Sequence, residues 1–370
     1  MHKRMILLNP GPVTLSARVR NALSAGDWCH RESEFADLTR EINSRLVGVY
    51  ADMRDDFESV MMTGSGTSAV EAMLASFAPA EGSTLVLANG IYGERMAQIL
   101  RAQRKPHELL QQSWTAALPL DEVARLLDRQ PEISHIATVQ HETTTGRLND
   151  IDGVGALCRE RKLMLLLDGV SSFGAERVDA GGWNLQALAG TANKCLHGVP
   201  GLSFVIAHRD AWSRPPANTG SVYLNLFGYH SAQHGSGYSP FTQAIQVAFA
   251  LREALQEHDE AGGWQSRRAL YRQRAAQTHT QLSELNVETL LDVDAYGSVL
   301  RSYRLPVGIT YQSLHDALKQ QGFIIYAGQG ELAQRIFRLA YMGDIQPADL
   351  EALSAALRSA LAPATTTNSR

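Results

Sequence analysis

The chain is poor in cysteine and has no long apolar run. Its three cysteines, Cys29, Cys158 and Cys195, are odd in number and lack the spacing of metal ligands, which indicates reduced thiols in a cytoplasmic protein. No stretch approaches about 18 consecutive apolar residues, so no transmembrane helix is expected. The apolar run near the N-terminus is too short for a signal peptide and stops at Pro10 and Gly11. We therefore expect a cytoplasmic protein that does not bind membranes.

The chain also lacks an excess of basic residues. The chain has 34 Lys and Arg against 38 Asp and Glu, a formal net charge of -4, which disfavours a nucleic-acid-binding protein. The segment "GSGTSAVEA" lacks the third glycine of a dinucleotide-binding fingerprint, and no GK[ST] of a P-loop follows it. A nicotinamide-dependent dehydrogenase is therefore disfavoured as well.

What the chain does have is an alternation of strand-like and helix-like segments between residues 60 and 210. Short apolar runs predict strands, and amphipathic stretches between them predict helices. The predicted strands are 83–90, 134–142, 162–172 and 202–209, and the predicted helices are 67–78, 93–103, 120–130 and 154–162. This order is typical of an α/β fold whose mostly parallel sheet is sandwiched by helices.

The remainder of the chain predicts a second, smaller α+β domain. A long helical pattern follows residue 240, and strand-like and helical segments alternate up to residue 362. We expect an N-terminal arm that contributes to the small domain, a large cofactor-binding domain, a small C-terminal domain and a disordered tail, at residues 1–20, 21–255, 256–362 and 363–370.

Lys194 stands apart from the other lysines of the chain. There are five lysines, and the other four have polar or charged neighbours, whereas Lys194 lies in "TANKCLHGVPG" among small and apolar residues. Desolvation and a nearby cation lower the pKa of such an amine and free its lone pair to attack an aldehyde. On this segment alone, a loop lysine that reaches solvent is the favoured interpretation.

Asp168 follows five apolar residues in "KLMLLLDGVSS", at the expected carboxyl end of a buried strand. Ligands of open α/β sheets bind just beyond such ends. A buried carboxylate needs a positive partner to remain ionised, and a protonated pyridinium nitrogen is one. A lysine on the aldehyde and an acid on the ring nitrogen are the groups that pyridoxal phosphate requires. The alternative is an Asp that caps the next turn.

Three further segments add weaker signals for the same cofactor. Ser65, Gly66 and Thr67 precede a helix, where backbone amides and hydroxyls can hold a phosphate, although a simple N-cap is the alternative. Tyr92, between two glycines, can lie flat over a planar ligand. Thr143 follows a strand and can donate a hydrogen bond to a phenolic oxygen. Together the five segments supply every group that the cofactor needs.

Arg338 lies in the otherwise apolar, strand-like segment "IFRLAYMGD". An arginine in such a run is usually paired, and its planar guanidinium matches a carboxylate or phosphonate. Two interpretations stay open here, a site for the anionic group of a substrate and an internal salt bridge to an Asp or Glu.

The order of these segments resembles the class V aminotransferases of PLP fold type I, from about residue 6 to residue 360. The resemblance is carried by "NPGP", "GSGTSAVEA", "NGIYGERM", "HETTTG", "LLLDGVSSFGA", "TANKCLHGVPG" and "FRLAYMGD". Within the family, "HETTTGRLNDIDGVGALCRE", "GTANKCLHGVPG" and "GFIIYAG" look closest to 2-aminoethylphosphonate:pyruvate aminotransferases.

The resemblance implies a role for each of these residues. Lys194 bonds to the aldehyde of the cofactor and then moves a proton, while Asp168 pairs with the pyridine nitrogen. The ring stacks on Tyr92, Thr143 contacts the phenolic oxygen, and Arg338 binds the substrate's carboxylate. The residues implied to bind the phosphate are Ser65, Gly66, Thr67, Asn193 and, from the neighbouring subunit of a homodimer with active sites at its interface, Thr242.

Two segments depart from the pattern and keep the amino donor open. "DWCHRESEF", with His30 and Arg31, looks more like the alanine–glyoxylate and serine–pyruvate branch, and these two side chains are candidates to contact a substrate's anionic end. Ala340 and Tyr341 stand where the family often has a glycine and a small or polar residue. We expect transfer from 2-aminoethylphosphonate to pyruvate; the alternatives are alanine–glyoxylate or serine–pyruvate transamination, a pyridoxal-phosphate-dependent lyase and a non-catalytic binding protein.

Overall fold

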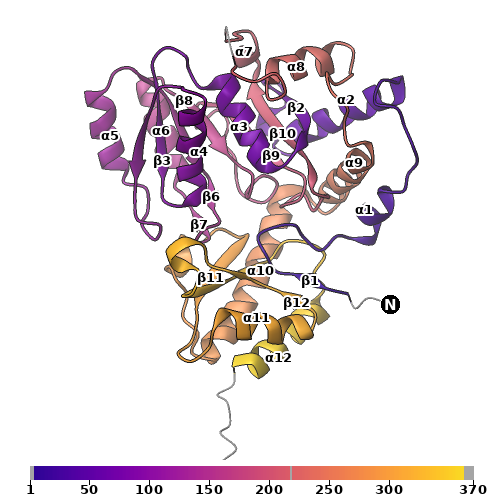
Figure 1. Ribbon diagram of the computed structural model, residues 1–370, viewed down its shortest axis with the longest axis vertical. Helices are drawn as coiled ribbons and strands as arrows, with labels where there is room; N and C mark the ends of the chain where they lie inside the picture. The colour runs from indigo at the N-terminus through magenta and orange to yellow at the C-terminus, as the bar shows by residue number, and fades with distance from the viewer. Residues whose placement is uncertain (1–3, 217–218, 362–370) are drawn as a thin grey trace, which may run out of the picture.

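A seven-stranded sheet forms the centre of the large domain in the computed structural model of the protein, which describes residues 4–216 and 219–361 (Figure 1). Its strands, in spatial order, are β2 (Phe57–Gly64), β10 (Gly201–His208), β9 (Leu185–Thr191), β8 (Met164–Asp168), β5 (Ile133–Val139), β3 (Ser83–Ala88) and β4 (His107–Gln111). Within this sheet β10 runs antiparallel to both of its neighbours, and the other strands are parallel to one another. This confirms the predicted α/β fold with a mostly parallel sheet.

Helices cover both faces of this sheet. Along β3, Leu85 and Leu87 pack into one apolar core and Val86 packs into another, as expected for a strand that is buried on both sides. The first core is shared with α2, α5, α6 and α9, and the second with α3, α4 and α8. The helices of this part are α1 (Ala17–Ala22), α2 (Ser33–Gly48), α3 (Gly66–Phe77), α4 (Ile91–Ala102), α5 (Leu120–Arg129), α6 (Ile151–Arg161), α7 (Arg209–Trp212), α8 (Leu226–Gly235) and α9 (Ile245–Glu260).

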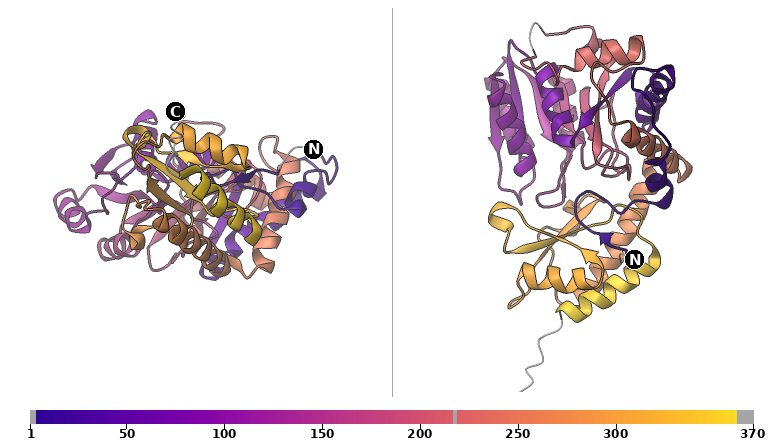
Figure 2. Two further views of the ribbon diagram at one scale, coloured as in Figure 1. Left: turned by 90° about the horizontal axis from the view of Figure 1, so that it is seen from below. Right: turned by 45° about the vertical axis from the view of Figure 1, so that its right-hand side comes forward.

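The smaller domain is α+β and lies at the lower end of the molecule in Figure 1. An antiparallel sheet has the order β11 (Leu300–Arg304), β14 (Ile336–Ala340) and β13 (Tyr326–Ala327). The N-terminal strand β1 (Ile6–Leu7) pairs in parallel with β12 (Phe323–Ile324), so the first residues of the chain join the small domain, as the right-hand view of Figure 2 also shows. The helices are α10 (Gly263–Glu284), α11 (Tyr311–Gln320) and α12 (Pro347–Leu361).

Buried arginines of α10 tie the two domains together. Arg267 donates a hydrogen bond to the carbonyl of Cys195 in the large domain (2.8 Å), and Arg274 donates one to the carbonyl of Tyr341 in the small domain (2.7 Å). Because Cys195 follows Lys194 directly in the chain, α10 supports the loop that carries the candidate lysine.

Several expectations concern features other than the sheet. All three cysteines are unpaired; Cys158 and Cys195 are buried and Cys29 is exposed. In the part of the chain that the structure describes, no helix combines the length and the apolar character that crossing a bilayer requires. The predicted tail, residues 363–370, lies outside the described residues.

Candidate active site

The predicted site segments meet at one edge of the large sheet. Since β10 is antiparallel to both β2 and β9, β2 runs parallel to the rest of the sheet, and the carboxyl ends of β2, β3, β5, β8 and β9 share this edge. Ser65 follows β2, Thr143 follows the hairpin strand β6 (His141–Glu142) after β5, and Asp168 ends β8. This edge is where open α/β sheets bind their ligands.

Lys194 lies in the hairpin that joins β9 to β10, and its amine is packed under the N-terminal arm. Its Nζ donates a hydrogen bond to the carbonyl of Pro10. Burial lowers the pKa of this amine to about 8; the positive charge of Arg338 also lowers the pKa, and the carboxylate of Asp168 opposes the shift. A fraction of Lys194 is therefore neutral near pH 7 and has the free lone pair that a nucleophilic amine requires.

Gly11 allows the arm to approach Lys194 this closely. A Cβ at Gly11 would come within 2.7 Å of Cδ and 2.8 Å of Cε of Lys194, and the backbone of Gly11 has a φ of 118°, which side-chain-bearing residues rarely adopt. "NPGP" was recognised in the sequence as part of the family pattern but without a role of its own. In the structure, Pro10 and Gly11 of this segment lie against the Lys194 side chain.

Asp168 is 6% exposed, and its carboxyl group accepts one hydrogen bond, from the backbone N–H of Val170 to Oδ1 (2.9 Å). Burial raises the pKa of Asp168 to about 7, and the charges of Lys194 and Arg95 only partly offset this shift. The carboxylate therefore lacks the close cation that would keep it fully ionised at neutral pH. A protonated ring nitrogen at this position would supply that charge.

The start of α3 fits an anion. Ser65 is the N-cap residue, but its side chain makes no cap hydrogen bond, and both Ser65 and Thr67 are exposed. The first backbone amides of a helix have no partner within the helix, and the helix dipole favours negative charge there. Gly66 lies so close to the loop after β8 that a Cβ would come within 2.6 Å of Val170 Cγ1. The predicted phosphate-binding residues at the start of α3 therefore lie next to the loop that follows Asp168.

Tyr92 lies in the first turn of α4, next to an arginine that the sequence analysis missed. The guanidinium of Arg95 lies 4.8 Å from the centroid of the Tyr92 ring, and its Nη1 donates a hydrogen bond to Thr67 Oγ1 (3.3 Å). Arg95 therefore connects Tyr92, which is predicted to stack on the cofactor ring, with Thr67, which is predicted to bind the phosphate. The spacing of three residues between Tyr92 and Arg95 on a helix could have revealed it, because such residues share a face.

Arg338 reaches the site from the small domain. It is 2% exposed, and its Nη1 donates a hydrogen bond to the carbonyl of Thr143 (2.7 Å) and its Nε one to the carbonyl of Ala327 (2.8 Å). Burial lowers its pKa. Among the described residues no carboxylate forms an ion pair with Arg338, so the internal salt bridge left open by the sequence is not formed. A buried guanidinium without a counter-ion favours an anionic ligand.

The hydroxyl of Thr143 is free to bind a ligand atom. Its Oγ1 is buried and has no hydrogen-bond partner among the described residues. Buried hydroxyls are rarely left unpaired, because an unsatisfied polar group costs free energy. An acceptor such as a phenolate oxygen would satisfy Thr143, so the residues at this edge fit pyridoxal phosphate.

The remaining predicted residues are less closely joined to this cluster. Asn193 lies beside Lys194 in the hairpin and accepts a hydrogen bond at Oδ1 from the hydroxyl of Thr191 (2.8 Å). His30 and Arg31 lie in the turn before α2, where Arg31 is exposed and forms no hydrogen bond or ion pair with a described residue. Their substrate roles stay predictions.

Thr242 is exposed, and the structure does not connect it to Lys194. The residues after it return to the end of β2, where the backbone N–H of Ala244 donates a hydrogen bond to Thr63 Oγ1 (3.0 Å). Thr242 therefore lies near the outer border of the site edge, and its contact with a neighbouring subunit stays a prediction.

Comparison with known proteins identifies the family. The family model described as Aminotransferase class-V matches residues 31–365. A 2-aminoethylphosphonate–pyruvate transaminase from Vibrio vulnificus is 34% identical over 365 residues, covering 98% of this chain and 99% of the relative. One from Pseudomonas aeruginosa is 32% identical and covers 96% of both chains.

Solved structures agree with this assignment at the level of the fold. The aspartate aminotransferase of subgroup IV from Thermus thermophilus is 26% identical and superposes with a TM-score of 0.87, covering 96% of this chain and 99% of its own. The alanine–glyoxylate aminotransferase from Nostoc sp. is 23% identical and has a TM-score of 0.89 over 98% and 96% of the two chains. The resemblance read from the sequence is confirmed, and the chain belongs to the class V aminotransferase family.

Proposed function

We propose that the protein is a pyridoxal-phosphate-dependent aminotransferase that moves an amino group from 2-aminoethylphosphonate to pyruvate, giving phosphonoacetaldehyde and alanine. The observation that carries the chemistry is the placement of Lys194, with its lowered pKa, and the buried Asp168 at one edge of the sheet. The choice of amino donor is supported by the names of the relatives that match nearly the full chain.

The residues of the site would hold the cofactor at defined atoms. Lys194 would bond to its aldehyde carbon, Asp168 would pair with its ring nitrogen, and Thr143 Oγ1 would donate to its phenolic oxygen. The phosphate would lie at the start of α3, with Asn193 nearby. When bound, the cofactor withdraws electrons from the substrate carbon next to nitrogen and carries the amino group between the two substrates.

Lys194 would move the proton. The Nζ of Lys194, whose pKa is about 8, would take a proton near neutral pH and would return it as an ammonium. A proton carrier works best when its pKa lies close to the working pH. Asp168 would remain a carboxylate beside the ring nitrogen and would stabilise the positive charge of that protonated nitrogen.

Arg338 would bind the anionic end of both substrates. Its guanidinium is fixed by the carbonyls of Thr143 and Ala327, so a phosphonate or carboxylate meets a rigid planar donor rather than a flexible side chain. The Thr143 carbonyl also links Arg338 to the residue proposed to contact the cofactor. The position of the substrate's anionic group and the position of the cofactor would therefore be linked through Thr143.

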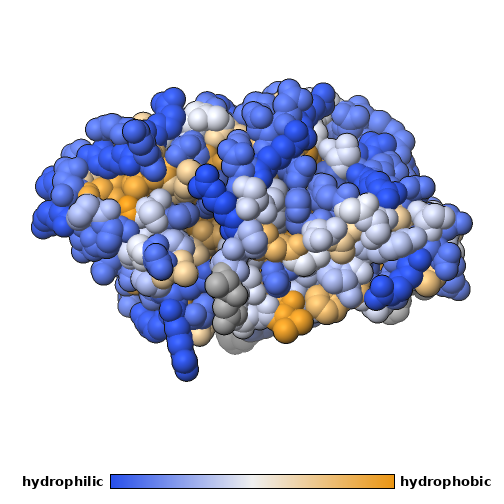
Figure 3. All heavy atoms as spheres, turned by 90° about the horizontal axis from the view of Figure 1, so that it is seen from above, coloured by the Kyte–Doolittle hydropathy of each residue, from blue (hydrophilic) through white to orange (hydrophobic). Residues whose placement is uncertain are grey.

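We further propose a homodimer in which Thr242 reaches the phosphate site of the neighbouring subunit. Thr242 follows Phe241, whose ring lies 5.1 Å from that of Tyr223, and Tyr223 and Val222 are 39% and 83% exposed. The face seen in Figure 3 is mostly hydrophilic with small apolar patches. Val222 and Tyr223 would be the apolar side chains of this segment that pack against the second subunit. Equilibrium sedimentation would detect the dimer, and a monomer with full activity would contradict it.

A panel of amino donors tests the reaction. Purified protein loaded with pyridoxal phosphate is mixed with 2-aminoethylphosphonate, alanine or serine, and the visible band of the cofactor is followed. We expect 2-aminoethylphosphonate to bleach the band and pyruvate to restore it with formation of alanine. Bleaching by alanine or serine only, restored by glyoxylate or pyruvate, would instead assign the alternative branch. Release of ammonia without an oxo acid would assign a lyase.

A further inference from the structure

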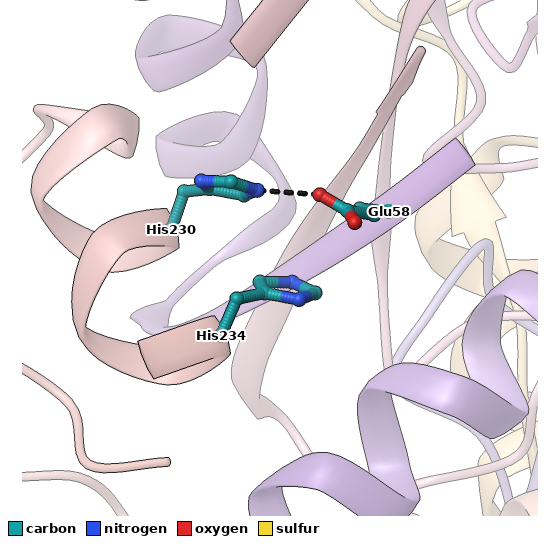
Figure 4. A group of neighbouring side chains, drawn as sticks. All are labelled: Glu58, His230 and His234. Atoms are coloured by element: carbon teal, nitrogen blue, oxygen red, sulfur yellow. Dashed lines mark hydrogen bonds and ion pairs between the residues drawn. The ribbon is translucent and has the colours of Figure 1, made fainter. Parts of the chain in front are cut away.

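A second cluster of polar side chains lies away from the candidate active site. Glu58 on β2 and His230 and His234 on α8 point toward one another (Figure 4), and their candidate ligand atoms all lie within 4.8 Å of one another. The two histidines are one helical turn apart and therefore share a face of α8. Glu58 is near the amino end of β2, whereas Ser65 follows its carboxyl end, about 20 Å away along the strand.

Neighbouring groups hold both imidazoles in place. The ring of Trp212 stacks on His230 with centroids 4.3 Å apart and an interplanar angle of 10°. His234 Nε2 lies 2.9 Å from the carbonyl oxygen of Ser59. Because a carbonyl only accepts, Nε2 of His234 carries the proton, and Nδ1 is left with a lone pair. A backbone carbonyl that fixes the tautomer of a histidine is a common support for metal ligands.

We propose that Glu58, His230 and His234 bind a divalent transition-metal ion of the zinc type, with water completing the coordination. Two imidazole nitrogens and one carboxylate oxygen form a usual donor set for Zn²⁺. Metal–ligand bonds of about 2.0–2.1 Å place tetrahedral ligand atoms roughly 3.3 Å apart. The candidate ligand atoms, which lie within 4.8 Å of one another, therefore have to approach by up to about 1.5 Å, which small adjustments of these incompletely buried side chains allow.

Two existing contacts compete with the ion and must open. His230 Nε2 lies 2.6 Å from Glu58 Oε2, and Arg209 Nε lies 3.5 Å from Glu58 Oε1. The side chain of Arg209 is 55% exposed, so it can turn into solvent. A simple ion pair between Glu58 and His230 would not require the second imidazole, whose ring centroid lies 4.6 Å from that of His230. The cluster of three ligands is what favours a metal.

The bound ion would fasten α8 to the edge strand β2. After α8 the chain leads to Thr242 and then returns to the end of β2 through the bond from the Ala244 N–H to Thr63. The segment between residues 235 and 244 would thus be attached to β2 at both ends. The inference concerns stability and metal binding, and it does not depend on the proposed function of the sheet edge.

Titration of the metal-free holoenzyme with Zn²⁺ tests the inference. The protein is treated with a chelator, loaded with pyridoxal phosphate and titrated with Zn²⁺ by calorimetry, in a Cys29→Ser background because this exposed thiol is itself a soft ligand. We expect one ion per chain and a higher midpoint of thermal unfolding. With Co²⁺ as the probe, a visible spectrum of a nitrogen- and oxygen-ligated site without a thiolate band is expected.

Variants of the ligands distinguish this site from adventitious binding. His234→Gln and Glu58→Gln should each weaken Zn²⁺ binding about tenfold or more. His315→Gln is the matched control, since His315 Nδ1 also lies close to a carboxylate, Asp316 Oδ1 (2.9 Å), but without a second histidine; it should bind Zn²⁺ as the parent does. Absence of a one-to-one site in the parent protein, or equal affinity in all three variants, would overturn the inference. Should a ligand variant fail to fold, the Co²⁺ spectrum of the parent decides.

Discussion

The ammonium group of Lys194 donates a hydrogen bond to the carbonyl of Pro10, a residue 184 positions earlier in the chain. The N-terminal arm, which is paired with the small domain through β1, therefore covers the candidate catalytic amine of the large domain. The arm therefore contributes to the burial of this amine.

Gly11→Ala should impair the site beyond its effect on the backbone. The new Cβ would come within 2.7 Å of Lys194 Cδ, so we expect slower uptake of pyridoxal phosphate and lower transaminase activity. Gly26→Ala is the matched control, because Gly26 also has a positive φ of 128° but no atom within 4 Å of the added Cβ. Both variants should lose on the order of 1–3 kcal/mol from backbone strain. Equal cofactor uptake in the two variants would contradict a role for the close approach.

Lys194→Ala should remove turnover while the fold is kept. Without the amine there is no covalent attachment of the cofactor and no proton carrier, so we expect a loss on the order of 10³-fold or more in kcat. Circular dichroism should match that of the parent, and the visible band of the bound cofactor should shift or disappear. Lys162→Ala changes a lysine next to the sheet that plays no part in the site and should leave activity intact. Residual activity near that of the parent would refute the assigned role.

Asp168 should make the stability of the cofactor-free protein depend on pH. Its pKa is raised from 3.8 to about 7 by burial, so the folded state holds the proton that the unfolded state has lost. Stability from this group is present below pH 3.8 and falls by up to about 1.4 kcal/mol per pH unit as the pH rises toward 7. Urea unfolding at several pH values should show this slope, and Asp168→Asn should flatten it. Parallel slopes in both proteins would show that the carboxyl is not perturbed.

Arg338→Gln should weaken use of anionic substrates. Removal of a buried charge that pairs with a ligand costs about 2–5 kcal/mol, which predicts a decrease in kcat/KM of roughly 30-fold or more for both the donor and the oxo acid. Arg335→Gln, an exposed change three residues earlier on the chain, serves as the control and should have little effect. Steady-state kinetics with both substrates measure the difference. A decrease in thermal stability without a change in kcat/KM would assign Arg338 a structural role only.

Most of the large sheet could be predicted because its strands are continuous apolar runs that end at polar residues. Leu165, Leu166 and Leu167 are fully buried, and Asp168 follows them at the sheet edge, so composition and position agree. β9 was missed, since "LQALAGT" is rich in alanine and glycine, which have little preference for strands, and only pairing with β8 and β10 makes it one. α10 was missed because Arg267 and Arg274 occupy buried positions where a helical pattern normally shows apolar residues.

The chemistry of the site was easier to predict than its geometry. Asp168 ends β8 and Thr143 directly follows β6, so the local sequence indicates their place, and Lys194 was indicated by its small and apolar neighbours. Contacts between distant segments give no such signal: Pro10 meets Lys194, and Glu58 meets His230 172 positions later. The role of Arg338 could be predicted only in part. Its charge in an apolar strand indicated a ligand or a salt bridge, and only the packing showed carbonyl partners in place of a carboxylate.

The antiparallel direction of β10 stabilises the loop that carries Lys194 against local unfolding. Because β10 is antiparallel to β9, it begins beside the end of β9, and the loop with Lys194 connects two neighbouring strands. The base of this loop is closed by a hydrogen bond from the Ala192 N–H to the Leu202 carbonyl (3.1 Å). The hairpin that carries Lys194 is thus held by two strands of the large sheet and not by the arm. We therefore expect the amide hydrogens of β9 and β10 to exchange with solvent far more slowly than those of the two-residue strand β1.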